Sequence, residues 1–549
     1  MNDQTTGFNL GTVFTHLAKV NPTRECIIWG DQRWTYSETL ERSRRLASFL
    51  ADRGYGASVE RDQLQGHESG QDHVALALYN GNEFLEGMLG SYLARLAPFN
   101  VNYRYVGDEL RYLFNDAKPK VLIFHAALAP VIEEIRADVP SIEVYLQVAD
   151  ESNNPLLSGA LAYEDALKMG SPEGPDVTPS PDDLYILYTG GTTGMPKGVL
   201  WRQHDIYMNC MGGRKIGSWE AVTSYDDVER NARDGFGLKV MILPPLMHGA
   251  AQWSSFIMMG DGATLVIPAN PRHQDPVDVL RTIERERVNT FNCVGDAMLR
   301  PLLDELDRGD YDTSSLLAIA NGGAPLTAAL KERTSARLPT VIISDSVGSS
   351  ETGAQMVSNA ATGSQQGQFR PGPGAVVVSE DLTRLLTPGE DSLGWLAQSG
   401  WVPLGYLGDA AKTEKTFPVI DGQRYAVPGD RARLLASGEI ELLGRDSVTI
   451  NSGGEKIFAE EVEGALAGHP SIADVVVAGR PSERWGSEVV AVVAFKPGSS
   501  ATYEELVAFA SNHIARYKLP KDVVVVDRVV RSPSGKADYR WAKEQATRD

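Results

Sequence analysis

The sequence is poor in cysteine and has fewer basic than acidic residues. Its three cysteines, Cys26, Cys210 and Cys293, are widely spaced and form no CxxC pair, which argues against a disulfide framework and a zinc site. We expect all three to pack as small apolar side chains in a reducing compartment.

The 52 Lys and Arg residues are outnumbered by 72 Asp and Glu residues, giving a formal net charge of −20. Dedicated nucleic-acid binding needs clustered basic side chains, so this charge indicates solubility instead.

Long apolar runs are also missing. The most hydrophobic window, from Ile257 to Pro268, is interrupted by Asp261 and is shorter than the roughly 20 residues of a membrane-spanning helix. The segment from Met1 to Gly11 is polar and lacks the basic-then-apolar order of a signal peptide. We therefore expect a cytoplasmic protein without a transmembrane segment. At 549 residues the chain is too long for one hydrophobic core, so at least two domains are expected.

Strand-like and helix-like segments alternate in the first half of the chain. Residues 74–78 and 121–124 have the pattern of buried strands, and residues 82–93 that of a helix. The residues Trp34-Thr35-Tyr36-Ser37 are predicted to open another, amphipathic helix that reaches about Arg53, with Ser37 as its N-cap. The alternation predicts an α/β fold of sheets covered by helices. The polar stretch 54–73 is long for a connection and is predicted to be an inserted surface loop.

Near residue 444 the pattern changes to a module of about 100 residues, which is the size of a small domain. Helices are predicted at 460–466 and 503–514, and strands at 472–478, 489–495 and 523–526.

The most informative segment runs from Tyr188 to Gly198 and reads YTGGTTGMPKG. It joins two apolar, strand-like runs, and its glycines and threonines offer many N–H and O–H donors to the oxygens of a triphosphate. Lys197 adds a positive charge. The Walker pattern does not fit, because Lys197 follows Pro196 and precedes Gly198. Taken alone, a flexible hairpin turn would explain the segment equally well.

Five further segments follow in order along the chain. They are NGGAPL at 321–326, SDSVGSSET at 344–352, YAVPGD at 425–430, GRDSVTINSGGEKI at 444–457 and SPSGK at 532–536. Each has an ordinary explanation by itself, such as a turn, a cap or a solvated surface. Together with the glycine-rich loop they resemble the adenylate-forming (AMP-binding) superfamily, which includes acyl-CoA synthetases, peptide-synthetase adenylation domains and firefly luciferase. The resemblance covers nearly the whole chain.

This resemblance implies a large N-terminal AMP-binding domain of stacked sheets covered by helices, residues 1–445. A small, mobile α+β domain, residues 446–549, would follow. The hinge of the family is usually an Asp or Lys two residues after the arginine. Here that position is Ser447, with Asp446 one residue earlier, and both assignments stay open.

The resemblance also implies an ATP site. Its residues would be Thr189, Gly190, Gly191, Thr192, Thr193, Gly194, Lys197, Gly322, Gly323, Ala324, Ser346, Val347, Gly348, Ser349, Ser350, Asp430 and Arg445. Asp430 would hold the ribose hydroxyls, and Glu351 would ligate Mg²⁺, a cation that prefers oxygen ligands. Lys536 would bridge the acyl carboxylate and the α-phosphate. Val347 stands where the family pattern has an aromatic that packs on adenine, so the base must lean on other surfaces.

The remaining implied sites concern CoA and the acid. Ser452, Gly453, Gly454 and Glu455 would line the CoA tunnel. The catalytic set would be Lys536, Glu351 and His248, with His248 gating the pocket between half-reactions. A histidine hydrogen-bonded inside a loop is the alternative for His248. The acyl pocket would be formed by His248, Trp253, Val294, Gly295 and Met298, with Gly295 leaving room for a large group.

Four short spans resemble a narrower group, the actinobacterial acyl-CoA synthetases that act on steroid side-chain acids and long fatty acids. These spans are 188–194, 201–203, 345–351 and 450–456. The function implied is ATP-dependent activation of a bulky apolar acid through an acyl-adenylate. Thioesterification with CoA follows, with release of AMP and pyrophosphate, and a sterol side-chain acid stands slightly ahead of a long fatty acid.

Three rivals remain: loading of a carrier protein in trans, luciferase-like oxidation, and a non-catalytic nucleotide-binding relative. ATP, Mg²⁺ and CoA are the expected ligands, and a homodimer is one of the assemblies left open.

Overall fold

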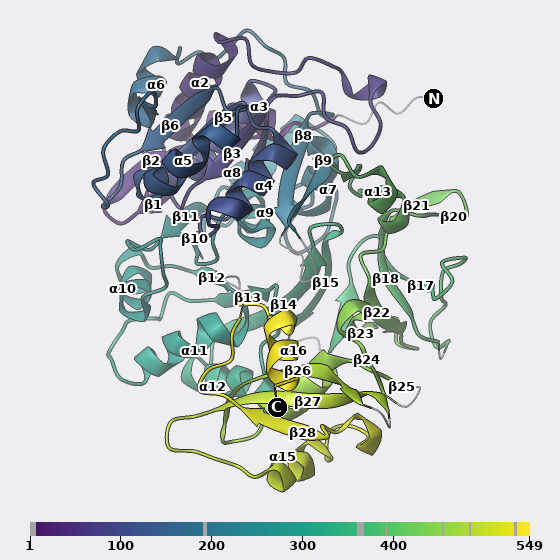
Figure 1. The fold of residues 1–549 in the computed structure, drawn as a ribbon. Coiled ribbons are helices and arrows are strands. Elements are labelled where there is room, and N and C mark those ends of the chain that lie inside the picture. The colour runs from purple at the N-terminus through teal and green to yellow at the C-terminus, as the bar shows by residue number, and fades with distance from the viewer. Residues whose placement is uncertain are drawn as a thin grey trace.

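The computed structural model describes residues 7–189, 195–359, 367–390, 392–452, 455–482, 485–531 and 535–548. Over these residues the chain forms a large N-terminal body, in which two sheets are packed with helices, and a small C-terminal body below it (Figure 1). The predicted α/β class and the large-plus-small arrangement are confirmed.

The first sheet is parallel over its central strands and ends in an antiparallel extension. The parallel part and its flanking strands run in the order β2 (Gln32–Thr35), β1 (Glu25–Trp29), β11 (Thr264–Ile267), β10 (Lys239–Ile242), β12 (Thr290–Cys293), β13 (Ala318–Gly322), β14 (Ile342–Ser349) and β15 (Gly353–Asn359). The extension continues with β16 (Gln368–Pro371), β23 (Ile440–Arg445), β22 (Asp430–Leu434), β18 (Gly394–Ser399), β21 (Gln423–Ala426) and β20 (Val419–Ile420), while β17 (Ala375–Ser379) pairs with β18. Helices α10 (Pro276–Glu286), α11 (Gly295–Leu306) and α12 (Ala328–Arg337) share one buried apolar cluster with the parallel strands.

The second sheet lies beside the first. Its order is β19 (Gly405–Tyr406), β9 (Lys197–Arg202), β8 (Leu184–Thr189), β4 (Ala97–Asn100), β3 (His73–Ala77), β5 (Val121–His125), β6 (Val144–Val148) and β7 (Leu161–Ala162). Helices α4 (Gly107–Ala117) and α5 (Ala129–Ile135) pack on one face. The largest apolar cluster joins both sheets through helices that include α1 (Leu10–Val20), α2 (Tyr36–Ala51), α3 (Asn82–Leu93), α6 (Tyr163–Met169), α7 (Gln203–Cys210), α8 (Tyr225–Asp234) and α9 (Gly249–Gly260). A further helix, α13 (Ala410–Thr416), follows β19.

The predicted elements of this body are present, with one correction. The N-cap of α2 is Thr35 and not Ser37, because the Thr35 hydroxyl accepts from the Glu38 N–H and the Glu38 carboxylate accepts from the Thr35 N–H. Such a capping box needs an acidic residue three positions after the cap, and Glu38 stands in that position. The inserted stretch is largely irregular, and its His67 carbonyl accepts a hydrogen bond from Gly408 N–H at 2.8 Å, which fastens it to the β19 edge.

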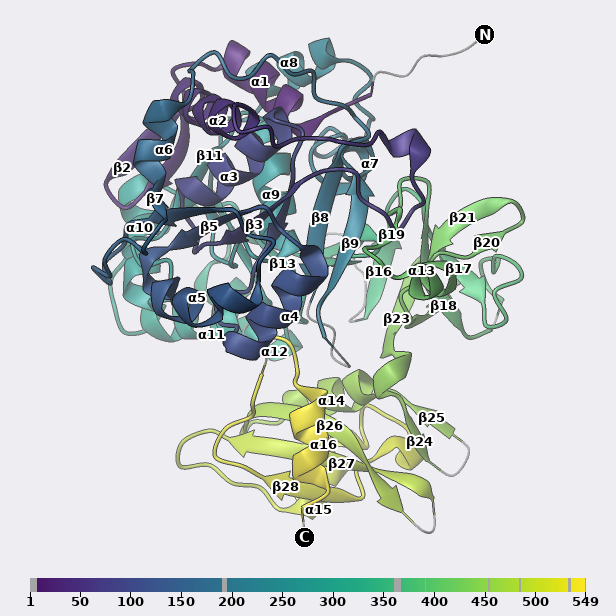
Figure 2. The ribbon, with the colours of Figure 1, turned by 45° about the horizontal axis from the view of Figure 1, so that its top comes forward.

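The C-terminal body follows a short 3₁₀ turn over Asp446–Val448. Its elements are β24 (Ile450–Ser452), β25 (Glu455–Ile457), α14 (Ala459–Ala467), β26 (Ile472–Ser482), β27 (Gly486–Phe495), α15 (Tyr503–Ala510), β28 (Asp522–Val525) and α16 (Tyr539–Ala546). The five predicted elements are confirmed, and α16 was not predicted. Helix α15 ends four residues earlier than expected, because Asn512 and His513 bond back to carbonyls only three residues before them. Figure 2 shows this body as a separate unit beneath the two sheets.

The cysteines behave as the sequence predicts. All three are buried and unpaired, and burial raises the pKa of each thiol. Across the described residues, none of the helices combines the length and the apolar character needed to cross a membrane.

One buried carboxylate joins three helices of the large body. Glu86 on α3 accepts hydrogen bonds from Arg42 of α2 at 2.7 and 3.1 Å, from Tyr163 of α6 at 3.0 Å and from Asn82 at 2.8 Å. Its neighbour Glu83 has a buried carboxylate oxygen without a hydrogen-bond partner among the described residues. Burial, followed by the charge of Glu86, raises the pKa of Glu83 to about 8. Folded Glu83 is therefore protonated at neutral pH.

This raised pKa predicts a pH-dependent stability. Between the ordinary glutamate pKa and about 8 the folded state holds a proton that the unfolded state has lost. Stability therefore falls as pH rises, by up to about 1.4 kcal/mol per pH unit. The variant Glu83→Gln has no such proton, so its stability should not fall in this way as pH rises. The melting temperature of the variant minus that of wild type should therefore be larger at pH 8 than at pH 5.5. Thermal unfolding checks this, with the half-exposed Glu41→Gln as control. An equal difference at both pH values would contradict it.

Candidate active site

A cavity of about 2250 Å³ lies where the small body meets the large one. Its wall draws on the end of β8, on β14, on the start of α9, on α11 and on the segment before α16. Single small-molecule sites usually measure about 300–1,000 Å³. This space is therefore large enough for more than one ligand.

The glycine-rich loop follows one strand of this wall. Strands β8 and β9 pair antiparallel with Thr189 opposite Lys197, and Thr189 lines the cavity. Gly190, Gly191, Thr192, Thr193 and Gly194 lie outside the described residues. The Lys197 ammonium forms an ion pair with Asp409, the N-cap of α13. In this arrangement Lys197 is held at the edge of the site.

The serine-rich end of β14 faces the same space. Ser346, Val347, Gly348, Ser349 and Ser350 all line the cavity. Gly322 and Gly323, from the neighbouring end of β13, line it as well, while the Ala324 carbonyl accepts from Asn321 Nδ2 at 2.9 Å. A Cβ on Gly322 would stand 2.7 Å from Ser346 Oγ, so a larger residue here would displace the Ser346 hydroxyl.

Four charged side chains converge beside these strands. Asp430 and Arg445 are opposite each other on β22 and β23, and Arg445 Nε donates to Asp430 Oδ1 at 3.2 Å. Glu351 Oε1 accepts from the Tyr406 hydroxyl at 2.8 Å. Burial lowers the pKa of Lys536, and so does Arg445, while Glu351 and Asp430 oppose the shift. Burial likewise raises the pKa of Asp430, against the influence of Arg445 and Lys536.

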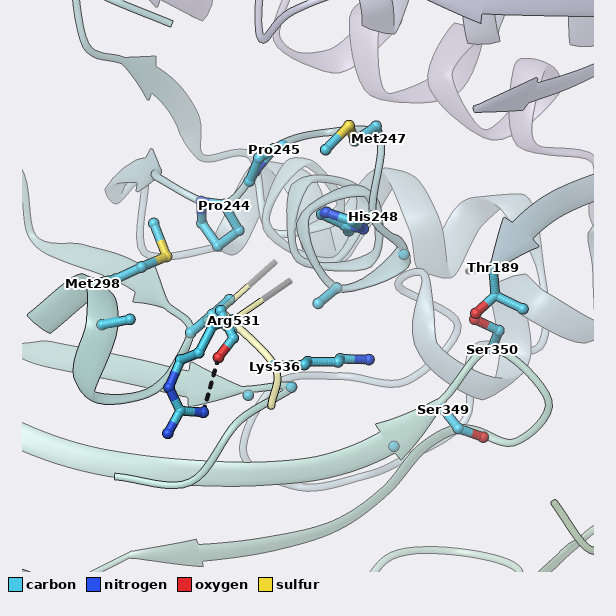
Figure 3. Close-up of a pocket in the computed structure, with 18 of the residues that line it drawn as sticks. Thr189, Pro244, Pro245, Met247, His248, Met298, Ser349, Ser350, Arg531 and Lys536 are labelled. Atoms are coloured by element: carbon cyan, nitrogen blue, oxygen red, sulfur yellow. Dashed lines mark hydrogen bonds between the residues drawn. The ribbon is translucent and has the colours of Figure 1, made fainter. Parts of the chain in front are cut away.

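Lys536 reaches this group from the small body. The preceding residue, Gly535, has a φ of +79° and packs against α11, where a Cβ would stand 3.4 Å from the Val294 carbonyl and 3.8 Å from Ala297 Cβ. Figure 3 shows the Lys536 side chain extending toward Thr189 and Ser350, with His248 across the cavity. The structure thus brings the predicted catalytic lysine to the predicted phosphate-facing residues.

His248 sits at the N-cap of α9 and lines the cavity. Its Nε2 is buried and has no hydrogen-bond partner among the described residues. Burial, Lys536 and Arg104 together lower its pKa to about 3. The imidazole is therefore neutral at working pH and cannot supply a positive charge, which fits a wall or gate better than a proton donor.

The predicted acyl wall is only partly as expected. Trp253, Val294 and Met298 line the cavity, and the Trp253 indole is fixed by donating to the Tyr185 hydroxyl at 3.2 Å. Gly295 has a different role from the one predicted. With φ at +62°, a Cβ there would stand 2.9 Å from Ala324 Cβ, so the glycine permits close packing at the start of α11 and leaves no room for substrate.

Many cavity residues were not predicted from the sequence, and two of them are Tyr103 and Arg104. Tyr103 and Arg104 line the space, with the Arg104 guanidinium 5.0 Å from the Tyr103 ring centre. Nothing in their local pattern marks them, because they belong to a connection between β4 and α4 that only the fold places here.

The predicted CoA residues stand apart from Lys536. Ser452 and Glu455 pair across the β24–β25 hairpin, and the intervening Gly453 and Gly454 lie outside the described residues. Val448 to Ile450 reach the cavity lining, but Ser452 does not. Among the described residues, Lys536 therefore lines the cavity and Ser452 lies outside the lining, although both belong to the small body.

A metal site built from protein alone is not found: within the described ranges no group of three or more His, Cys, Asp or Glu side chains could hold an ion. Mg²⁺ is commonly bound by one or two carboxylates together with substrate phosphates and waters. A single carboxylate, Glu351, directly after the cavity-lining Ser350 fits that mode of binding.

Family comparisons agree with this geometry. The chain matches the AMP-binding enzyme family over residues 14–406 and the AMP-binding enzyme C-terminal domain over residues 461–536. A medium-chain acyl-CoA ligase, Mig, of Mycobacterium avium is 58% identical over 547 residues and covers 100% of both chains. A medium/long-chain-fatty-acid–CoA/3-oxocholest-4-en-26-oate–CoA ligase of Mycobacterium tuberculosis is 40% identical over 542 residues, which are 98% of this chain and 96% of the relative.

Solved structures share the fold. An anthranilate CoA ligase, AuaEII, in complex with anthranoyl-AMP aligns with a TM-score of 0.81 at 19% identity, over 99% of this chain and 98% of the other. ATP-bound MatB from Rhodopseudomonas palustris aligns with a TM-score of 0.79 at 22% identity, over 98% and 99%. The chain therefore belongs to the AMP-binding enzymes, in the branch of the acyl-CoA ligases.

Proposed function

We propose that this protein activates an apolar carboxylic acid with ATP and transfers the acyl group to CoA, releasing pyrophosphate and AMP. The observation that carries the proposal is the burial of Lys536, from the small body, beside Glu351, Asp430 and Arg445 of the large one. The same cavity has apolar walls from Trp253, Val294 and Met298 that suit the acid.

In the first half-reaction an oxygen of the carboxylate attacks the α-phosphorus, and the bond to the pyrophosphate oxygen breaks. Negative charge builds on the phosphoryl oxygens, so a fixed cation there stabilises the transition state. Lys536 supplies that cation and also holds the carboxylate. Asp430 accepts from the ribose hydroxyls, Arg445 contacts ribose or phosphate, and the loop from Thr189 to Gly194 with Lys197 holds the outer phosphates.

The remaining ATP contacts come from the glycine and serine segments. Gly322, Gly323 and Ala324 lie against the base, and the β14 end from Ser346 to Ser350 contacts the phosphates. Glu351 would hold Mg²⁺, which when bound neutralises phosphate charge. Val347 is half-buried against an apolar cluster, so its side chain offers the base only a small surface.

In the second half-reaction the CoA sulfur attacks the acyl carbonyl, and AMP leaves. The hairpin with Ser452, Gly453, Gly454 and Glu455 would then replace Lys536 at the site through rotation of the small domain. His248 would open or close the pocket between the two steps.

We place the domain boundary at the 3₁₀ turn between residues 445 and 449. Asp446 accepts from Arg431 Nε of the large body at 2.9 Å, and Arg431 is almost fully buried. Because that ion pair keeps Asp446 with the N-terminal domain, the rotation begins at Ser447. The proposed domains are then residues 1–446 and 447–549, so the boundary lies one residue later than in the predicted division into 1–445 and 446–549.

The acid is proposed from the relatives and the wall. A ligase named for medium-chain acyl groups is 58% identical, and one named for both fatty and steroid acids is 40% identical. We therefore rank a medium- or long-chain fatty acid ahead of a steroid side-chain acid, reversing the order suggested by the short sequence spans.

A cytoplasmic location and a homodimer remain parts of this proposal, the latter testable by sedimentation.

A pyrophosphate-release assay tests the function. With ATP and Mg²⁺, fatty acids of increasing length and a steroid side-chain acid should stimulate release, and CoA should allow repeated turnover. Apolar acids should exceed acetate and benzoate by at least about tenfold in kcat/KM, since each buried CH₂ contributes about 0.8 kcal/mol. Preference for acetate or benzoate would overturn the substrate class, and no release with any acid would overturn the function.

The variant Lys536→Ala should separate the half-reactions. Loss of the ammonium should slow acyl-adenylate formation about 10²–10³-fold, because the charge developing at phosphorus is left unbalanced. Thioester formation from a supplied acyl-adenylate and CoA should remain near wild type. Single-turnover assays of each step measure this. Equal losses in both steps would be inconsistent with the assigned role.

The variant Glu351→Gln should raise the magnesium requirement. Removing the carboxylate charge should increase the Mg²⁺ concentration for half-maximal pyrophosphate release roughly tenfold. The matched variant Glu441→Gln, on β23 and outside the cavity lining, should not. An unchanged magnesium titration in Glu351→Gln would remove this residue from the metal site.

A further inference from the structure

The segment that carries Lys536 is attached to the small body at both ends. Arg531 and Ala537 form an antiparallel bridge that closes the segment at its base. After Lys536, Asp538 caps α16 by accepting from Trp541 N–H at 3.0 Å. Tyr539 then donates its hydroxyl to Glu463 of α14 at 3.2 Å. Lys536 therefore lies between two fixed points.

Arg531 makes the first of these attachments with one side chain. Its Nε and Nη2 donate to the two carboxylate oxygens of Asp474 at 2.8 and 2.6 Å, a two-pronged ion pair. Its Nη1 donates to the carbonyl of Gly535 at 3.3 Å, and Nη2 lies 3.4 Å from the Val475 carbonyl. The guanidinium thus joins strand β26 to the residue immediately before Lys536. Figure 3 shows Arg531 close to Lys536.

This attachment matters because the Lys536 ammonium is moved out of water. Burial lowers its pKa, so the charged side chain is held in the cavity at a cost in free energy. Its long, flexible stem also loses conformational freedom there. The acidic residues of the large body act on the ammonium end alone. A support at the base of the side chain is therefore needed to keep the ammonium in place.

We infer that Arg531 is a positioning residue for acyl-adenylate formation: by holding Asp474 and the Gly535 carbonyl together, it fixes the backbone from which Lys536 enters the cavity. Arg531 acts through Lys536 and has no part in the thioester step. This inference rests on the proposed role of Lys536.

The geometry distinguishes a guanidinium from other cations. A lysine at position 531 carries one ammonium and cannot pair with both Asp474 oxygens while reaching Gly535. The chain also offers a matched control. Arg480 lies on β26, the strand that carries Asp474, and pairs with Glu488 at 2.6 Å and with Asp522 at 2.7 Å. Its side chain is 29% exposed, against 27% for Arg531. Both of these partners lie on strands of the small body, β27 and β28, and neither belongs to the Lys536 segment.

The test compares Arg531→Met, Arg531→Lys and Arg480→Met in the full-length protein. Arg531→Met should slow acyl-adenylate formation about 10- to 100-fold, as expected for a misplaced catalytic group. Thioester formation from supplied acyl-adenylate should stay near wild type, Arg531→Lys should be intermediate, and Arg480→Met should match wild type in both steps. In a Lys536→Ala background, Arg531→Met should cause no further loss. Equal losses in both steps, or a further loss without Lys536, would overturn the inference.

A second measurement does not depend on activity. Amide hydrogen exchange of the peptide covering residues 535–538 should be faster in Arg531→Met than in wild type and Arg480→Met, since a support of that backbone is lost. Unchanged exchange would overturn the inference, whether or not the wild type releases pyrophosphate. If the wild type releases no pyrophosphate, that result would refute the proposed function instead. If Arg531→Met does not fold, Tyr539→Phe removes the other attachment and should show the same split between half-reactions. No split there would count against the inference.

Discussion

The site depends on one costly interaction, the burial of the Lys536 ammonium from the small body within the large one. A charged amine leaves water only where other charges and fixed dipoles replace its hydration. Here Glu351 and Asp430 oppose the effect of burial on its pKa, while Arg445 adds to that effect. In the proposed function an ATP phosphate and the carboxylate of the acid bring further negative charge to this ammonium, which would couple substrate binding to domain closure.

The rest of the large body holds these charges in place. Asp430 and Arg445 are neighbours because β22 and β23 are paired, and the serine-rich end of β14 lies beside Gly322 because β13 runs parallel to it. The first contact is made across an antiparallel pair of strands, and the second across a parallel pair. Strand pairing restrains them to a single geometry, as fixed positions of catalytic groups require.

The small body has the opposite property. Among its described residues, Val448 to Ile450, parts of β26 and β27 and the segment around Gly535 and Lys536 line the cavity, whereas Ser452 of the β24–β25 hairpin does not. In the proposed function the Lys536 segment and that hairpin serve different chemical steps, which requires the small domain to turn. The ion pair between Arg431 and Asp446 fixes one side of the connection, and we propose that the motion begins at Ser447.

The sequence by itself determined the family, the two-part architecture and the order of the chemical groups, because these depend on local patterns such as glycine spacing, strand and helix periodicity and single charged residues. It also gave α3 its observed limits. It misplaced the cap of α2 by two residues and assigned Gly295 to the pocket, because a cap is decided by hydrogen bonds and a glycine by what its missing Cβ would meet. Only the tertiary structure decided that the charge of Arg104 helps to lower the pKa of His248, that Lys197 pairs with Asp409, and that Arg531 supports Lys536. The local sequence around these residues does not predict the contacts, because the residues are brought together only by strand pairing and domain docking.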